Sequence, residues 1–391
     1  MIKKRVLIFI LTFGLIFTVQ GIAKKKRKAE ASQFKIITKV KTTPPKDQGK
    51  TGTCWCFSTT SFLESELLRM GKGEYDLSEM FTVRNNYLMK AVNYIRLHGN
   101  ATFGQGGQAH HVFKSIKKYG IVPESVYPGL GYGGKKHNHS ELFRILKGFL
   151  NNLIVNRWGA TISSVWFEAY QKILDTYLGK YPEKFKYNGK RYTPKSFLDY
   201  LGINPDDYVE FTSYDLYPFY KKVRLEVPDN WDFDSNYYNV PIDELEKIVG
   251  YALKHGYSVV WDGDISEGYF SSRKAGLGVV PKDWDKTPPD KRDKLLIPSV
   301  KEKDIDQKMR RETFLTFETT DDHLMHIVGI AKSKSGKKFY YVKNSGGTKG
   351  RYKGFLYLSK AFFRLKTIAV TLHKNAIPPE VKEKIGPISG K

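Results

Sequence analysis

Apolar residues recur at helical spacing immediately after a glycine-rich loop near the start of the chain. Their spacing fits one stripe of an α-helix, so a buried helix is predicted to begin near Cys54. The apolar positions are Phe57, Phe62, Leu63, Leu67 and Leu68. The start of this helix therefore carries a cysteine, and the loop of residues 48–53 leads into it.

The hydrophobic pattern divides the rest of the chain between helical and extended segments. Helical spacing predicts helices that end near Tyr94 and Tyr119, amphipathic helices over residues 142–155 and 165–178, and one from Pro241 to Lys254. Short apolar or alternating runs predict strands at residues 34–40, 257–262, 324–330 and 339–343. No internal repeat accompanies these segments.

The first residues have the pattern of an export signal. A charged segment, Lys3-Lys4-Arg5, precedes an apolar run from Val6 to Val19, and small residues follow at Gly21-Ile22-Ala23. The run is shorter than the ~20 apolar residues that a membrane span needs. We therefore expect a signal peptide, export to the periplasm or the exterior, and no stable membrane span after cleavage. An uncleaved anchor is the alternative.

The chain is strongly basic, with a formal net charge of +25 at pH 7. Such a charge favours anionic partners such as nucleic acid, envelope polymers or acidic peptides. The lysines are scattered, however, and the compact block is Lys24-Lys25-Lys26-Arg27-Lys28. A solvated basic surface with a flexible N-terminal arm is favoured over a nucleic-acid site, and it allows weak, non-specific binding of polyanions.

The only two cysteines of the chain are Cys54 and Cys56. One residue separates them on the predicted helix, a geometry unsuited to a disulfide between them. Cys56 is expected to face the core. No cluster of further ligands accompanies the pair, so we expect neither a metal site nor another cofactor.

Cys54 is the candidate nucleophile. The first turn of a helix carries unpaired N–H groups and a partial positive charge, which favour a thiolate over a thiol. The side-chain amide of Gln48 lies close enough in sequence to point to the same place as the Cys54 N–H and to form an oxyanion hole with it. The alternative is that Cys54 is a small core residue, as free cysteines often are.

Such a thiol needs a histidine, and the segment of residues 319–330 contains two. An apolar strand begins at His323, three positions before His326. A shift of three places the two side chains on opposite faces of a strand, so both cannot serve one site. Asn344 follows the next predicted strand. An asparagine there can accept an imidazole N–H and orient the ring, although asparagine in a turn is also routine.

Three segments resemble the papain-like cysteine peptidases. They are Gln48 to Ser58 with Gly52-Thr53-Cys54-Trp55 inside it, Asp321-Asp322-His323, and Val342-Lys343-Asn344-Ser345. The family pattern selects His323 rather than His326 as the catalytic histidine. In papain the histidine and asparagine follow the cysteine by ~130–150 residues. The longer separation here resembles the bleomycin hydrolase and aminopeptidase C branch, whose members carry long helical insertions.

The resemblance implies an α+β, papain-like fold with a helical half that carries the cysteine, a sheet-rich half that carries the histidine and asparagine, and a helical insertion. The segments expected on this basis are a signal peptide (1–23), a basic arm with the first strand (24–46), the helical half (47–128), the insertion (129–243), the sheet-rich half (244–377) and a C-terminal tail (378–391).

The resemblance also implies how substrate binds. Gly106 and Gly107 would line the cleft, where missing side chains let a substrate backbone pair with the protein. Gly346 stands where the family usually has a tryptophan that shields the His–Asn bond, so a weaker bond is expected. In this branch the C-terminal tail commonly lies in the cleft and restricts the enzyme to aminopeptidase action, and subunits form ring-shaped hexamers. His110 and His111 are interpreted as cleft-rim or packing residues.

We therefore predict a cysteine peptidase that hydrolyses peptide bonds through an acyl-enzyme, with aminopeptidase favoured over endopeptidase action. Its predicted catalytic residues are Cys54, His323, Asn344 and Gln48. One alternative is a cell-envelope amidase that acts on murein peptides, suggested by export and charge. Another is a catalytically weakened protein of the same fold that binds peptides or polyanions, suggested by Gly346.

Overall fold

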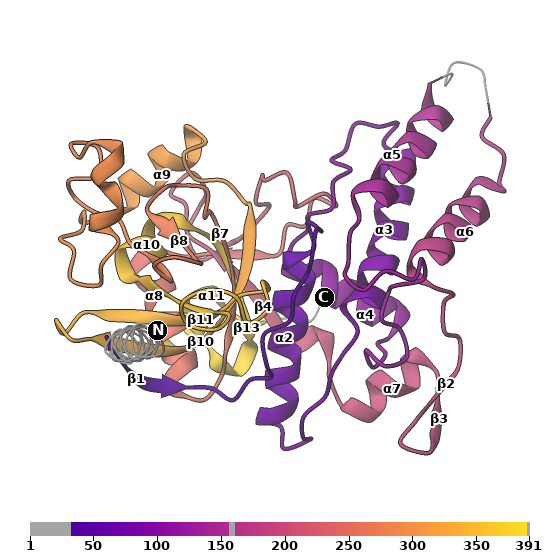
Figure 1. The fold of residues 1–391 in the computed structure, drawn as a ribbon, viewed down its shortest axis with the longest axis horizontal. Helices are drawn as coiled ribbons and strands as arrows, with labels where there is room; N and C mark the ends of the chain where they lie inside the picture. Colours follow the sequence, from indigo (N-terminus) through magenta and orange to yellow (C-terminus); the bar gives the residue numbers. More distant parts are fainter. Residues whose placement is uncertain (1–32, 156–160, 389–391) are drawn as a thin grey trace, which may run out of the picture.

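The computed structural model describes residues 33–155 and 161–388. The predicted signal peptide and the basic block after it lie outside the described residues. The described chain forms two halves that lie side by side, with helices gathered in one and a large sheet in the other (Figure 1). This arrangement confirms the predicted α+β class.

The helical half is built around α2 and α3, which contact each other and α4; α5 and α6 pack against α3. Its helices are α2 (Cys54–Arg69), α3 (Glu79–Arg96), α4 (Ala109–Tyr119), α5 (Ser140–Ile154), α6 (Trp166–Leu178) and α7 (Pro194–Leu201), and a hairpin of β2 (Phe185–Tyr187) and β3 (Lys190–Tyr192) precedes α7. The apolar spacing after Cys54 thus predicted both the presence and the start of α2.

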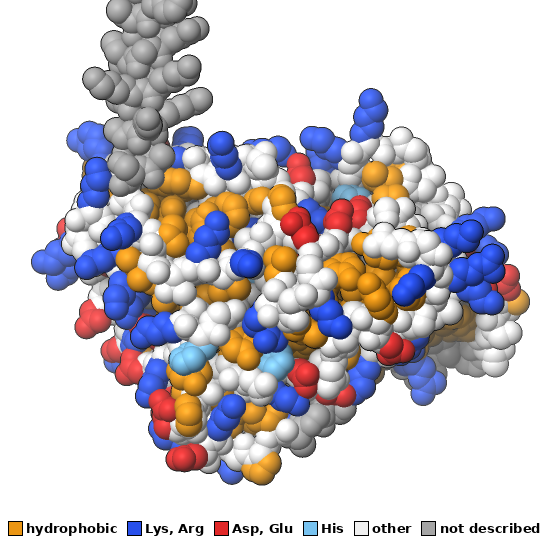
Figure 2. All heavy atoms as spheres, turned by 90° about the horizontal axis from the view of Figure 1, so that it is seen from below, with side chains coloured by type: hydrophobic (Ala, Val, Ile, Leu, Met, Phe, Trp, Pro, Cys, Tyr) orange, Lys and Arg blue, Asp and Glu red, His pale blue; other side chains and the backbone are white. Residues whose placement is uncertain are grey.

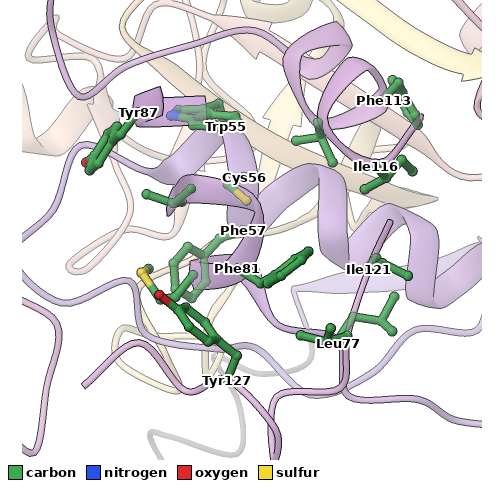
Figure 3. Packing of buried hydrophobic residues seen from close by; sticks show 14 of the residues in the cluster. Trp55, Cys56, Phe57, Leu77, Phe81, Tyr87, Phe113, Ile116, Ile121 and Tyr127 are labelled. Atoms are coloured by element: carbon green, nitrogen blue, oxygen red, sulfur yellow. The ribbon is translucent and has the colours of Figure 1, made fainter. Parts of the chain in front are cut away.

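The core of this half surrounds α2. Trp55, Cys56 and Phe57 lie among apolar side chains of α3 and α4 (Figure 3). Cys56 is fully buried, and its Sγ lies 3.3 Å from the carbonyl oxygen of Glu79. The expectation that Cys56 faces the core is therefore confirmed.

The other half contains an eleven-stranded sheet with the order β5-β6-β4-β13-β7-β10-β11-β12-β9-β8, and β1 pairs with β10. The strands are β1 (Phe34–Lys39), β4 (Tyr208–Thr212), β5 (Lys222–Val223), β6 (Tyr237–Asn239), β7 (Val259–Gly263), β8 (Phe270–Ser271), β9 (Leu277–Gly278), β10 (His323–Ser333), β11 (Lys338–Lys343), β12 (Phe355–Ser359) and β13 (Thr367–His373). The central strand β10 begins at the candidate histidine.

The predicted boundary of the insertion is wrong at its C-terminal end. Residues 208–239 were assigned to inserted helices and loops, but they supply β4, β5 and β6 to the main sheet, where β4 pairs with β13. The physical reason is that Tyr208–Thr212 is a short run rich in aromatic and β-branched residues, and all five are buried between neighbouring strands.

The two faces of the sheet are covered by different elements. Val260 and Leu324 point towards the helical half and join its core, whereas Trp261 and Met325 point to the opposite face. That opposite face is covered by α8 (Ile242–Lys254), whose apolar residues pack there. The two faces are therefore distinct environments, and only the first adjoins Cys54.

The C-terminal helix α11 (Pro379–Ile385) packs on the α8 side. Val381 is buried in that cluster, and Ile385 and Ile388 pack against it. Lys384 forms an ion pair with Glu244 of α8. The described part of the tail therefore lies on the face of the sheet away from Cys54.

Helices α9 (Gln307–Leu315) and α10 (Lys360–Lys366) contact each other beside β12 and β13. Within the described ranges, no helix is both long and apolar enough to cross a bilayer. Figure 2 shows that lysine and arginine side chains are dispersed over one face among acidic and uncharged groups, in keeping with the predicted scattering of charge.

Candidate active site

Cys54 is the first residue of α2 and follows a tightly folded loop. Gly49 has a φ of +68°, and a Cβ there would lie 2.3 Å from the carbonyl oxygen of His137. The Gly52 N–H donates to Oε1 of Gln105 (2.8 Å), and the indole N–H of Trp55 donates to the Gln105 carbonyl oxygen (2.9 Å). The loop is thus held on both sides of the cysteine.

His323 and Asn344 form the hydrogen bond that the sequence predicted. The distance from His323 Nε2 to Asn344 Oδ1 is 2.8 Å, and the same oxygen accepts the Ser345 N–H at 2.8 Å. An acceptor at Nε2 places the ring proton there. His323 Nδ1 is then the nitrogen that can take a proton from a thiol.

The structure brings Cys54 to the beginning of β10. The Ser58 hydroxyl of α2 donates to the carbonyl oxygen of Leu324 at 2.6 Å, which fixes the helix across the strand. The backbone N–H of Leu324, the residue directly after His323, bonds to the Cys54 thiol. The thiol therefore contacts the residue that directly follows His323, although α2 and β10 are far apart in sequence.

The surroundings favour the neutral forms of both groups. Burial raises the pKa of Cys54 to about 12, although the backbone N–H groups of Leu324 and Trp55 act against it. Burial also lowers the pKa of His323 below its usual value, although Asn344 and Asp322 act in the opposite direction. Loss of hydration thus opposes the thiolate that the helix N-terminus favours.

Gln48 joins the two halves beside this pair. Its backbone N–H donates to the Ser345 carbonyl oxygen at 2.9 Å, and its Oε1 accepts the Ser345 hydroxyl at 2.5 Å. One hydrogen of its side-chain Nε2 is donated to the Thr51 carbonyl oxygen at 2.7 Å. The amide has a second hydrogen, which remains suited to the predicted oxyanion contact.

A cavity of about 280 Å³ opens next to the His–Asn pair. It is lined from the helical half by Gln48 and from the sheet-rich half by His323, Asn344 and Gly346. A Cβ at Gly346 would meet no atom within 4 Å. The place of the family tryptophan is thus open space here, yet the 2.8 Å His–Asn bond is formed without it.

Gly106 and Gly107 lie on another flank of Cys54, where the Asp229 carboxylate covers them. A Cβ at Gly106 would lie 1.9 Å from Asp229 Oδ2, and the Gly107 N–H donates to the same carboxylate. Lys90 donates to the Gly106 carbonyl oxygen from the core side. The Asp229 carboxylate therefore occupies the space beside these glycines, where the sequence predicts a substrate backbone.

The second histidine of β10 serves packing. His326 is fully buried, and its Nδ1 lies 2.9 Å from the Ser61 hydroxyl of α2. Asn344 bonds to His323 instead. The two histidines of β10 therefore have different hydrogen-bond partners, Asn344 for His323 and Ser61 for His326.

Among the described residues, His110, His111 and Asp232 form a group with the spacing of metal ligands. The backbone N–H of Gln108 donates to His111 Nδ1 at 2.8 Å, so a neutral His111 carries its proton on Nε2 and has no lone pair to offer there. That Nε2 lies 3.0 Å from Asp232 Oδ1. Hydrogen bonds with Gln108 and Asp232 thus engage both ring nitrogens of His111.

Sequence reasoning missed Asp229 and the acidic residues near it. Asp229 lies in a loop, and no periodicity or motif marks it. The sequence marks Asp321 only as a neighbour of His323 and Asp262 only as the end of a predicted strand. A pair of glycines facing an acid from a distant loop could not be read from spacing along the chain.

A helical half and a sheet-rich half, with a cysteine at a helix start beside a His–Asn pair, define a papain-like cysteine peptidase. A family model described as the Peptidase C1-like family matches residues 16–387, and the chain belongs to this family.

Known proteins similar to this chain include several bacterial aminopeptidases. Aminopeptidase C of Lactobacillus helveticus is 24% identical, with 88% of this chain and 82% of the relative covered. Aminopeptidase W of Lactobacillus delbrueckii subsp. lactis is 25% identical, with coverages of 86% and 82%. The crystal structure of PepW from Lactobacillus rhamnosis matches with a TM-score of 0.69 at 22% identity, over 92% of this chain and 86% of PepW. The structural match supports the fold.

Proposed function

We propose that this protein is a cysteine aminopeptidase that hydrolyses peptide bonds through an acyl-enzyme. The observation that carries the proposal is the His323–Asn344 hydrogen bond at the start of β10, where the next residue, Leu324, contacts the Cys54 thiol. Relatives named aminopeptidase C, G and W support aminopeptidase over endopeptidase action. The catalytic roles of the individual residues are part of the proposal.

The acylation step begins with two neutral groups. As the Cys54 sulfur attacks the peptide carbonyl carbon, His323 Nδ1 takes the thiol proton, and the second Gln48 amide hydrogen and the Cys54 N–H stabilise the oxyanion. Asn344 holds the imidazole in the required orientation through Nε2. His323 then donates its proton to the leaving amine, the C–N bond breaks, and a thioester remains.

Water completes the reaction. His323 takes a proton from the water molecule that attacks the thioester carbonyl, the C–S bond breaks, and the acid product leaves. The proton returns to the Cys54 sulfur, so the thiol is restored. Every proton transfer in this scheme is assigned to one imidazole.

The two other interpretations are less well supported. The named relatives are aminopeptidases, which does not favour an amidase of murein peptides. A catalytically weakened binding protein was suggested by Gly346, but the His–Asn bond is 2.8 Å long despite the glycine.

Substitution of the two cysteines tests the proposal. We expect Cys54→Ala to reduce kcat for aminoacyl-coumarin substrates by a factor on the order of 10⁶, as loss of a nucleophile does elsewhere. Cys56→Ala is the matched control, because Cys56 is buried in the core two positions away and should retain activity. Equal activity of the wild type and Cys54→Ala would refute the proposal.

We also propose that the protein is exported and that it assembles as a homo-oligomer. The charged and apolar pattern of residues 3–23 supports export, and the hexamers of the resembled branch support assembly. N-terminal sequencing of the protein from fractionated cells would test the first, with residue 24 expected as the new N-terminus. Sedimentation equilibrium would test the second, and a monomer at all concentrations would contradict it.

A further inference from the structure

Residues 227–234 form a loop that touches both halves of the molecule beside Cys54. The Asp229 carboxylate accepts the Gly107 N–H of the helical half. The Asp229 backbone N–H donates to Asp321 Oδ2 at 2.9 Å, and Asp321 lies two residues before the candidate histidine. The charge of Asp229 also reaches the Cys54 thiol, whose pKa it raises. Asp229 therefore lies within electrostatic reach of the Cys54 thiol.

The loop is firmly attached to α3 and α4. The Trp231 ring stacks on His111 with 4.5 Å between ring centroids, and Asn93 of α3 donates to the Trp231 carbonyl oxygen at 2.9 Å. Asp232 bonds to His111 at 3.0 Å and forms an ion pair with Lys114. Asp229 is thus presented by a fixed wall of the site, and no movement of the loop is needed to place it.

Acidic side chains accumulate at this position. Asp262 of β7 is 3% exposed, and neither of its carboxylate oxygens has a hydrogen-bond partner. Burial raises the pKa of Asp262 well above its usual value, although the Gln108 side chain, whose amide donates to Asp321, acts against this shift. Asp262 points to the same face of the sheet as Val260 and Leu324, and the charges of Asp229, Asp321 and Cys54 all act on it. An unpaired, buried carboxylate therefore adjoins the two acids that face the site.

Lys90 offsets only part of the negative charge of Asp229 and Asp321. Lys90 lowers the pKa of Asp229, yet burial leaves that pKa above its usual value, and burial together with Asp229 raises the pKa of Asp321 to about 7. Asp229 and Asp321 are both only half-buried, so a ligand can reach them. A cation bound here would relieve the repulsion among these carboxylates.

We infer that the Asp229 carboxylate, with Asp321 behind it, binds the free α-ammonium group of the peptide substrate. This inference rests on the proposed aminopeptidase function and assigns its selectivity to an internal loop. Because Asp229 covers Gly106 and uses the Gly107 N–H, a substrate chain cannot continue along these glycines. The site ends here at a negative charge, and the described tail lies on the far face of the sheet.

The test compares free and N-acetylated forms of the same aminoacyl-coumarin substrate. The wild type should prefer the free amine, and Asp229→Asn, which keeps the shape but removes the charge, should raise KM for the free amine at least tenfold while kcat changes little. Hydrolysis of the N-acetylated form should be unchanged or faster. Asp199→Asn is the matched control, since Asp199 lies exposed on α7 and removes the same charge elsewhere.

A second variant separates the loop from the chain terminus. Removal of residues 389–391 should leave the preference for a free amine intact. If this truncation abolishes the preference while Asp229→Asn retains it, the inference is overturned and the C-terminus is the receptor. Equal hydrolysis of free and acetylated substrates by the wild type would also overturn it, although the protein would remain a peptidase.

Binding to the Cys54→Ala variant tests the inference without catalysis. Calorimetry should give a dissociation constant for alanyl-alanine amide that is at least tenfold higher when Asp229→Asn is added, and no such change for the N-acetylated peptide. An unchanged dissociation constant contradicts the inference. If the wild type hydrolyses neither substrate but the ammonium-dependent binding persists, the proposed function fails and the binding site stands.

Discussion

The two flanks of Cys54 differ in what occupies them. On the Asn344 flank, a cavity of about 280 Å³ is open, and a side chain at Gly346 would meet nothing within 4 Å. On the Gly106 flank, an aspartate fills the corresponding space, and a side chain at Gly106 would collide with it. The difference teaches that glycine has two uses at this site. One glycine leaves room for a ligand, and the other makes room for the protein's own carboxylate.

In this comparison, the largest loss of activity should follow from removal of the His323 imidazole, which lies between the two flanks. We expect His323→Ala to reduce kcat/KM by about 10²–10⁴-fold, the usual contribution of a general acid–base residue. The measurement is steady-state hydrolysis of an aminoacyl-coumarin. His326→Ala should retain activity if it folds, and a similar loss in both variants without unfolding would contradict the assignment.

The pH dependence of kcat/KM should reveal the state of the resting pair. Neutral His323 is the required base, and its lowered pKa keeps it neutral below the usual value of about 6.5. Activity should therefore persist into mild acid and fall only below pH 6.5. Alkylation of Cys54 by iodoacetamide without substrate should rise steadily from pH 6 to 9, because burial raises the thiol pKa. A plateau across that range would indicate a preformed thiolate.

A smaller effect is expected from the oxyanion contact on the open flank. Gln48→Ala should reduce kcat by about 10²–10³-fold, the typical cost of removing one oxyanion donor. Because Ser345 also uses this side chain, Gln48→Glu serves as the comparison, since it keeps an acceptor for the Ser345 hydroxyl and lacks the donor. Full activity of Gln48→Glu would show that the amide hydrogen is not used.

Gly106→Ala sharpens the comparison on the closed flank. The added Cβ would lie 1.9 Å from Asp229 Oδ2, so the carboxylate must move. We expect a loss of about 1–3 kcal/mol in the free energy of unfolding from the overpacking, together with a weaker preference for a free amino group. Urea denaturation measures the first and the paired substrates the second; an unchanged preference would argue against the position of Asp229.

Gly346→Ala is the same substitution on the open flank and should have the smallest effect. Its Cβ meets no neighbour within 4 Å, so the free energy of unfolding should stay within about 0.5 kcal/mol of the wild type. Urea denaturation under the same conditions provides the measurement. A loss as large as that of Gly106→Ala would show that the two flanks do not differ as described.

The sequence predicted the elements that depend on local periodicity. The apolar stripe after Cys54 located α2, and the apolar run after His323 located β10, because burial of one face imposes its period on the chain. The choice of His323 over His326 and the pairing with Asn344 came from the family pattern, and the 2.8 Å bond agrees with that choice.

The sequence could not predict contacts between distant segments. β4 was missed because a five-residue strand inside a loop-rich region has too short a pattern to stand out. Asp229 was missed because its position is set by Trp231 stacking on His111 and by Asp232 bonding to α4, which no spacing encodes. The burial that raises the pKa of Cys54 could not be predicted either, because it is a property of the folded chain.

The paired hydrogen bonds between Gln48 and Ser345 tie the proposed oxyanion donor to the residue that follows Asn344. If one half moved against the other, the Gln48 amide and Asn344 would move together, so their positions relative to each other would be kept. To broaden the substrate range, substitutions should therefore avoid the Gln48–Ser345 contact and be made on the Gly106 flank instead.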